Sequence, residues 1–126
     1  MAKFVKGDVV VVPFPFSDLS QSKRRPALVI TSLDSDDIIL CQITSKTIKD
    51  NYSLSLNDKD FETGSLKQPG NLRPNRIFTA DHHIILYRVG NLKSEKLTDV
   101  IEKIVEIIRG KNTTSDNKAQ TADAQT

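Results

Sequence analysis

The sequence contains little of what marks several large protein classes. Cys41 is the only cysteine among 126 residues, which excludes an internal disulfide framework and any zinc site built from several thiolates. No apolar run approaches the roughly 20 residues that cross a membrane, and the chain does not open with a signal-peptide pattern. We therefore expect a protein of the reducing cytoplasm with no membrane association.

The chain also lacks a large excess of charge of either sign. Its 18 lysines and arginines and 16 aspartates and glutamates leave a net charge of +2, so a nucleic-acid site has to be local. There is no glycine-rich phosphate loop, dinucleotide fingerprint, nucleophile elbow or acidic cluster that would hold two magnesium ions. We expect no metal and no cofactor. Phosphodiester cleavage would then require a substrate with its own nucleophile, which RNA has in its 2′-hydroxyl.

Apolar periodicity identifies one helix near the C-terminus. Apolar side chains recur at spacings of three and four between Ser94 and Arg109. Ser94 is the expected N-cap, and Gly110 is expected to end the helix in a left-handed conformation. The stripe is predicted to lie on a core and comprises Leu97, Val100, Ile101, Ile104, Val105 and Ile108. Residues 111–126 contain no Leu, Ile, Val or aromatic residue and are predicted to be a disordered polar tail after a single domain of residues 1–110.

The rest of the chain is typical of a β protein. Short runs rich in Val, Ile and Leu, without helical crossovers between them, favour an antiparallel sheet curled into a small barrel with the C-terminal helix packed against it. Pro13 and Pro15 donate no ladder hydrogen bonds, so the first strand should stop, bulge or run along an edge near Phe14. The expected strands are Asp8–Val12, Ala27–Thr31, Ile38–Ile43, Tyr52–Leu56, a stretch around Asn75–Thr79, and Ile84–Val89.

Two polar segments adjoin apolar strands. The loop Ser17–Arg25 delivers three consecutive cations, Lys23, Arg24 and Arg25, where a hydrophobic strand begins, and arginines held at their base suit phosphate groups. A solvated basic turn explains the same residues. Thr44, Ser45 and Lys46 end another apolar run, where hydroxyls either meet a ligand or bond the local backbone.

Two further clusters are less specific. Arg73, Asn75 and Arg76 add two cations and an amide that fits a base edge, although Pro74 and Asn75 equally fit a turn. His82 and His83 are neighbours, so on a strand they would point to opposite faces and would not share one metal. We expect a structural or surface role for each histidine.

Several of these segments together resemble the MazF/PemK/Kid toxins of bacterial toxin–antitoxin systems. The resemblance covers about Lys6 to Arg109 and rests on GDVVVVPFPFSDLSQSKRRPALVIT, ILCQITS and LRPNRIFTAD. It implies an SH3-like barrel that forms a homodimer and cleaves single-stranded RNA sequence-specifically without metal. It also implies a cognate antitoxin that holds the toxin inactive and with which the toxin binds DNA.

The resemblance assigns roles to particular residues. Arg25 matches the family's catalytic arginine and Thr44 its catalytic threonine, and both would stabilise negative charge while the 2′-hydroxyl attacks phosphorus, leaving a 2′,3′-cyclic phosphate and a 5′-hydroxyl. Leu19 and Asn75 stand where Kid-like members carry a histidine and an acid, so a Kid-like acid–base set is incomplete. Expected RNA contacts are Ser17, Gln21, Lys23, Arg24, Ser45, Lys46, Arg73, Asn75 and Arg76.

Two other functions fit the same fold. One is a non-enzymatic toxin like the CcdB-type poisons, which bind DNA gyrase, and it predicts growth arrest with intact RNA. The other is a degenerate module that holds RNA or an antitoxin without cutting. The presence of Arg25-Pro26 and Thr44 favours the nuclease, because a gyrase binder has no need for an RNA-cleaving pair.

Overall fold

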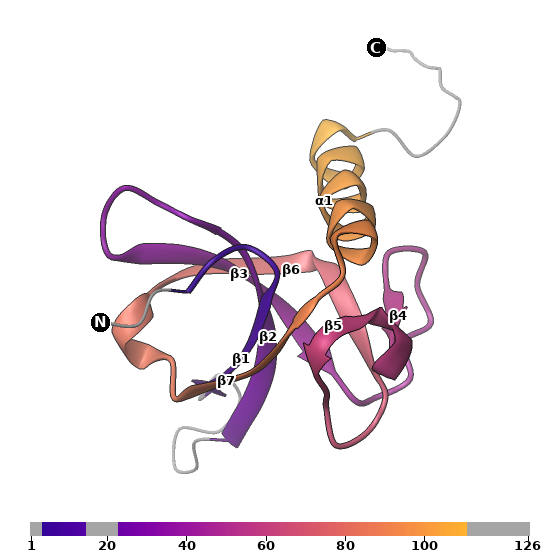
Figure 1. Cartoon of the computed structure of the whole chain (residues 1–126). Coiled ribbons are helices and arrows are strands. Elements are labelled where there is room, and N and C mark those ends of the chain that lie inside the picture. The colour runs from indigo at the N-terminus through magenta and orange to yellow at the C-terminus, as the bar shows by residue number, and fades with distance from the viewer. Residues whose placement is uncertain (1–3, 15–22, 111–126) are drawn as a thin grey trace.

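The chain folds into one strongly curved antiparallel sheet with a single α-helix at its C-terminal end (Figure 1). The computed structural model describes residues 4–14 and 23–110, so the predicted tail and most of the Ser17–Arg25 loop lie outside the described residues. The strands follow the order β4-β6-β3-β2-β1-β7-β5 across the sheet. They are β1 (Asp8–Phe14), β2 (Lys23–Ser32), β3 (Asp37–Thr44), β4 (Leu54–Leu56), β5 (Phe61–Gly64), β6 (Gly70–Asp81) and β7 (Tyr87–Leu92).

The central strands bury side chains on both faces. Val9 of β1 points into a cluster with Leu28 and Cys41, whereas Val10 points into a second cluster with Val29 and Leu40. Successive side chains of a strand face opposite sides, so an unbroken valine run requires a core on each side of the sheet. This double burial explains why Val9–Val12 of β1 are all apolar instead of alternating with polar residues. The predicted antiparallel barrel-like fold with a C-terminal helix is confirmed.

Helix α1 (Ser94–Arg109) has the predicted bounds and packs mainly against β6. Val100 and Ile104 are buried, but Ile108 is 71% exposed because the last turn extends beyond the sheet. The expected N-cap was wrong: Lys93 holds that position without a side-chain hydrogen bond, and Ser94 is already helical. Gly110 adopts the left-handed conformation at φ 76° and ends the helix as predicted.

Several strand bounds differ from the prediction because pairing partners decide them. β2 begins at Lys23 rather than Ala27, since its first residues pair with Val12–Phe14 of β1. β5 was not predicted, because its short FETG sequence carries a single buried apolar residue, Phe61. β7 is shifted towards the C-terminus, and the residues His82–Ile84 before it form the short 3-10 helix η2.

The prolines lie where the sheet tolerates them. β1 pairs with β7 only as far as Val11, so Pro13 faces one neighbouring strand, β2, as expected for a strand that becomes an edge. β6 runs through Pro74, but its pairing with β3 shifts register between Arg73 and Ile77, so residues 74–76 form an irregular stretch instead of a turn. Within the described residues, no helix combines the length and apolar character that spanning a membrane requires.

Candidate active site

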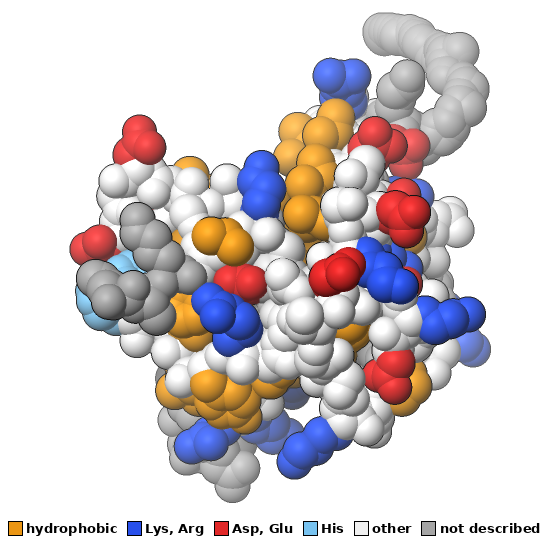
Figure 2. All heavy atoms as spheres, viewed as in Figure 1, with side chains coloured by type: hydrophobic (Ala, Val, Ile, Leu, Met, Phe, Trp, Pro, Cys, Tyr) orange, Lys and Arg blue, Asp and Glu red, His pale blue; other side chains and the backbone are white. Residues whose placement is uncertain are grey.

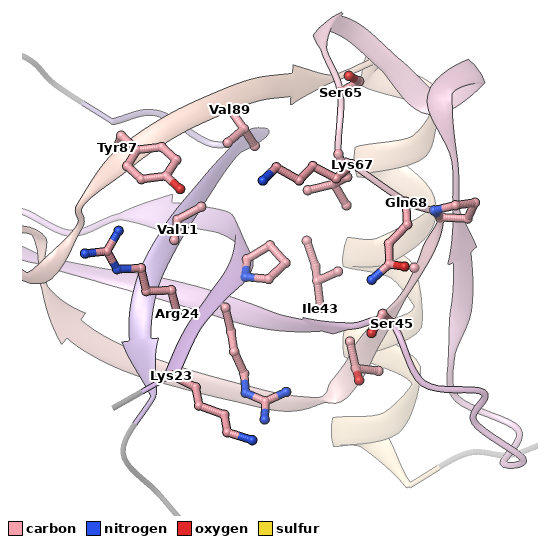
Figure 3. Close-up of a pocket in the computed structure, with 16 residues that line it drawn as sticks. Val11, Lys23, Arg24, Ile43, Ser45, Ser65, Lys67, Gln68, Tyr87 and Val89 are labelled. Carbon is pink, nitrogen blue, oxygen red and sulfur yellow. The ribbon is translucent and has the colours of Figure 1, made fainter. Parts of the chain in front are cut away.

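A cavity of about 440 Å³ opens beside the ends of β2 and β3 (Figure 3). Its floor is apolar and includes Pro26, Ile43 and Val89, while its rim carries polar and charged side chains. The volume falls within the range of sites that bind small ligands or single nucleotides. The complete lining is Val11, Lys23, Arg24, Arg25, Pro26, Ile43, Thr44, Ser45, Ser65, Leu66, Lys67, Gln68, Pro69, Gly70, Tyr87 and Val89.

Arg25 and Thr44 line this one cavity from neighbouring strands. β2 and β3 are antiparallel, and Ala27 of β2 lies opposite Gln42 of β3. Two residues further along each strand, the same register places Arg25 of β2 opposite Thr44 of β3. The arginine is half-buried and the threonine is buried, at 5% exposure. The base of each side chain is therefore held by the sheet, which limits the entropy lost when a ligand binds.

The hydroxyl of Thr44 is fixed by the backbone that follows it. Its Oγ1 accepts a hydrogen bond of 3.2 Å from the backbone N–H of Lys46. The carbonyl of Lys46 in turn accepts from Nδ2 of Asn71, at 2.9 Å. A hydroxyl that accepts one hydrogen bond still has its own proton to donate, so Thr44 retains a donor for a bound oxyanion. The local backbone bond and a ligand contact are thus compatible.

The cavity is strongly cationic for a protein of net charge +2. Lys23, Arg24, Arg25 and Lys67 line it, and no aspartate or glutamate is among its described lining residues. Positive charges in a confined, partly apolar site attract anions more strongly than the same charges do in open water. The arrangement suits a phosphodiester, and it offers no carboxylate ligands for magnesium.

Sequence reasoning missed three prominent lining residues. Tyr87 begins β7, and Lys67 and Gln68 belong to the loop between β5 and β6. Figure 3 shows the Lys67 side chain extending across the cavity in the direction of Val11 and Tyr87, with Gln68 turned towards Ser45. No local motif distinguishes these residues, because only the curvature of the sheet brings β7 and the β5–β6 loop to β2 and β3.

The cluster Arg73, Asn75 and Arg76 does not line the cavity. Nη2 of Arg73 forms an ion pair of 3.5 Å with Oδ2 of Asp50, and its Nε is buried without a hydrogen-bond partner among the described residues. Asn75 and Arg76 are exposed on the irregular stretch of β6. These three residues are thus outside the cavity lining, although Arg73 pairs with Gln42 of β3, two residues from Thr44.

Asp50 organises the loop that follows β3. Its Oδ1 accepts from the backbone N–H groups of Tyr52 and Ser53, at 2.9 and 3.0 Å. The bond from Tyr52 is the largest influence that holds the pKa of Asp50 below its ordinary value, and Arg73 adds to it. Arg73 is thus tied to a loop-forming carboxylate.

The remaining predicted RNA contacts differ in whether they line the cavity. Ser45 lines the cavity, whereas Lys46 is exposed just outside it. Ser17 and Gln21 lie outside the described residues. The structure therefore gathers Lys23, Arg24, Arg25, Thr44 and Ser45 from the predicted set.

The opposite-face geometry that a strand would give the two histidines does not apply. His82 and His83 lie on η2 rather than on a strand, and their ring centroids are 4.2 Å apart. The tight turn of a 3-10 helix removes the alternation of a strand, so both rings reach the same side. One ligand atom of each histidine and one of Asp36 lie within 4.8 Å of one another.

A comparison with protein families gave one match. The family model described as a PemK-like, MazF-like toxin of type II toxin–antitoxin systems matches residues 5–108. A search of curated proteins gave no match.

Solved structures share the fold at low sequence identity. MazF of Deinococcus radiodurans (form I) has a TM-score of 0.68 at 18% identity, over 86% of this chain and 99% of that one. A MazE–MazF structure from the same organism (form II) has a TM-score of 0.69 at 18% identity, over 86% and 98%. A mycobacterial endoribonuclease in complex with its cognate antitoxin has a TM-score of 0.65 at 12% identity, over 86% and 96%.

Proposed function

The chain belongs to the PemK-like, MazF-like toxins of type II toxin–antitoxin systems, and from this premise we propose that it is an endoribonuclease that cleaves single-stranded RNA without a metal ion. The observation that carries the proposal is the shared cavity of Arg25 and Thr44. A guanidinium and a hydroxyl held by adjacent strands are suited to an oxyanion that develops between them.

The proposed reaction uses the substrate's own nucleophile. The 2′-oxygen loses its proton to solvent and forms a bond to the adjacent phosphorus, and the bond from phosphorus to the 5′-oxygen breaks as that oxygen takes up a proton from solvent. The products are a 2′,3′-cyclic phosphate and a 5′-hydroxyl. Arg25 stabilises the additional negative charge on the phosphorane oxygens, and Thr44 donates a hydrogen bond to one of them. Arginine keeps its proton at neutral pH, so charge stabilisation is its role here.

The rest of the cavity supports binding of a nucleotide strand. Lys23, Arg24 and Lys67 supply cations for flanking phosphates, and Ser45 and Gln68 supply polar groups for a base edge. Tyr87 is 49% exposed at the rim and offers a ring on which a base can stack. Ser17, Gln21, Lys46, Asn75 and Arg76 are proposed as outer contacts. Arg73 orders the loop held by Asp50.

The charge of the lining supports a mechanism without metal. Two-metal nucleases need several carboxylates to hold their ions, and no described residue of this lining is acidic. Four cations around the cavity serve the same electrostatic purpose, because they neutralise the phosphodiester directly.

The proposal includes protein partners. Members of this fold have been solved with an antitoxin, including MazE–MazF of Deinococcus radiodurans. We propose that a cognate antitoxin inhibits this chain, and that the chain acts as a homodimer in the cytoplasm, where its RNA substrate is found. The antitoxin would also mediate DNA binding by the pair.

The test is RNA cleavage by purified protein in EDTA. A mixed-sequence single-stranded RNA is expected to be cut, and a copy with deoxyribose at the cut position is expected to stay intact. Arg25→Ala and Thr44→Val should each reduce the rate about 100- to 1,000-fold. Arg109→Ala, at an exposed arginine outside the cavity, is the matched control and should cleave normally.

Other outcomes would identify a different function. Cleavage that needs magnesium, or that survives loss of the 2′-hydroxyl, would contradict the mechanism. Growth arrest by the expressed chain with intact RNA would favour a non-enzymatic toxin such as a gyrase binder. RNA binding without cutting by the wild-type protein would favour a degenerate binding module.

A further inference from the structure

The end of the sheet away from the cavity carries a compact group of histidine and aspartate side chains. Asp36 precedes β3 in the β2–β3 hairpin, and His82 and His83 form the start of η2 directly after β6. β3 and β6 are paired up to Asp37 and Asp81, which lie opposite each other. The β2–β3 hairpin and η2 therefore lie next to each other at the same end of these two strands. Figure 2 shows the histidines beside acidic side chains at one end of the molecule.

The three side chains converge to a spacing near that of a metal site. One ligand atom from each of Asp36, His82 and His83 lies within 4.8 Å of the others, and Nε2 of His82 is 3.7 Å from Oδ1 of Asp36. Ligands around a tetrahedral zinc ion are about 3.4 Å apart, given metal–ligand bonds of about 2.1 Å. The side chains of Asp36 and His83 are 71% and 72% exposed, so small rotations can close the remaining gap.

The backbone and a neighbouring carboxylate already hold the ligands in place. The backbone N–H of His82 donates to the carbonyl of Asp36 at 2.9 Å, which joins the hairpin to η2. Oδ1 of Asp81 lies 2.6 Å from Nδ1 of His83 and also accepts from its backbone N–H. In the tautomer in which Nδ1 of His83 carries the proton and donates to Asp81, Nε2 keeps a free lone pair, as in carboxylate–histidine–zinc arrangements.

The local charge also favours a cation. Asp37 and Asp81 are directly opposite on β3 and β6, and carboxylates in that relation repel each other. Asp34 and Asp36 add two exposed carboxylates in the same hairpin. A bound divalent ion would offset this repulsion.

We propose that Asp36, His82 and His83 bind a divalent transition-metal ion, with Asp81 positioning His83. Two imidazoles and one carboxylate suit Zn²⁺ and the related ions Ni²⁺ and Cu²⁺, and they leave a coordination position for water. β3 is eight residues long, so this site is about 23 Å along the strand from Thr44. The ion clamps the β2–β3 hairpin to η2 and takes no part in RNA cleavage, so the inference stands independently of the proposed function.

The experiment is a calorimetric titration of the tag-free, full-length protein with ZnCl₂ at pH 7.5. One ion per chain is expected to bind with micromolar affinity and to raise the midpoint of thermal unfolding. The chain contains two histidines, so ¹⁵N spectra of the imidazole groups report on both proposed nitrogen ligands and should shift together.

Variants test the two histidine ligands and the positioning carboxylate separately. His82→Asn and His83→Asn should each weaken Zn²⁺ binding more than tenfold, and Asp81→Asn should weaken it about tenfold while its oxygen still caps η2. Asp34→Asn removes the same charge from an exposed residue of the same hairpin that is not in the cluster, and should bind Zn²⁺ normally.

Circular dichroism of the metal-free variants should match the wild type, because the His83 side chain is largely exposed. Absence of Zn²⁺ binding to the wild type would overturn the proposal. So would binding that survives both histidine replacements, or imidazole signals that do not respond to the metal.

Discussion

Gly70 of β6 lies against the backbone of Thr44 of β3, so closely that a Cβ atom on Gly70 would stand 3.0 Å from the Thr44 carbonyl oxygen and 3.3 Å from Cγ2 of Ile43. Both neighbours belong to β3 and line the cavity. A methyl group at this position has to push β3 by a few tenths of an ångström. The absence of a side chain at residue 70 therefore contributes to the position of the threonine hydroxyl.

We expect Gly70→Ala to reduce RNA cleavage about tenfold or more, because catalytic geometry tolerates little displacement. The unfolding free energy should fall by about 1–3 kcal/mol, as for an overpacked core. Initial rates at saturating RNA and urea denaturation of the same sample measure both effects. Unchanged turnover would show that the contact does not position Thr44.

Tyr87 should act through its ring rather than its hydroxyl. We expect Tyr87→Ala to raise KM for RNA by about 5- to 150-fold, the equivalent of about 1–3 kcal/mol of stacking, and Tyr87→Phe to change it little. Steady-state kinetics on a short oligonucleotide give KM and kcat separately. A large loss in the phenylalanine variant would assign the contact to the hydroxyl instead.

Asp50 should contribute to stability in a pH-dependent way. Its pKa is held below the ordinary value, chiefly by the backbone N–H of Tyr52, so its ionised form is favoured in the folded state. That contribution is complete above the unfolded pKa of about 4 and is lost as the pH falls through the lower, folded pKa. Asp50→Asn should therefore flatten the decline of stability below about pH 4 in urea denaturation.

Cys41 should be unreactive in the native protein. It is fully buried between apolar side chains, and this burial raises the pKa of its thiol to about 12. The reactive thiolate is consequently scarce near neutral pH. We expect a disulfide reagent at pH 8 to label Cys41 only as fast as the chain unfolds, and at once in denaturant. Rapid labelling of the folded protein would contradict the burial of this side chain.

Much of the fold was predictable from local patterns. The 3.6-residue spacing between Leu97 and Ile108 and the glycine at 110 predicted the range of α1, although not its N-cap, because a helix is governed by contacts close in sequence. The strands were found wherever they carry several buried apolar residues. β5 and the first residues of β2 were missed, because backbone pairing with β7 and β1 creates them and their own side chains give no such signal.

The candidate site was predictable only in part. Arg25 and Thr44 were singled out by the family resemblance and by their places at strand ends, and the structure brings both to one cavity. Tyr87 and Lys67 gave no signal, because a lone tyrosine and a lone loop lysine have many equivalent environments. The placement of the histidine pair on η2 was not predicted, because the short 3-10 turn after β6 has no distinct sequence pattern.

The sequence by itself determined the chemistry available to this protein: few ligands for a structural metal, a small charge excess, an apolar β core and one amphipathic helix. Only the tertiary structure decided which of those groups meet. The curvature of the sheet places four cations and a tyrosine around one cavity. The pairing of β3 with β6 places Asp36 close to the two histidines. Local sequence encodes the direction of each side chain, but proximity between distant residues follows from strand pairing and burial, which depend on the whole chain.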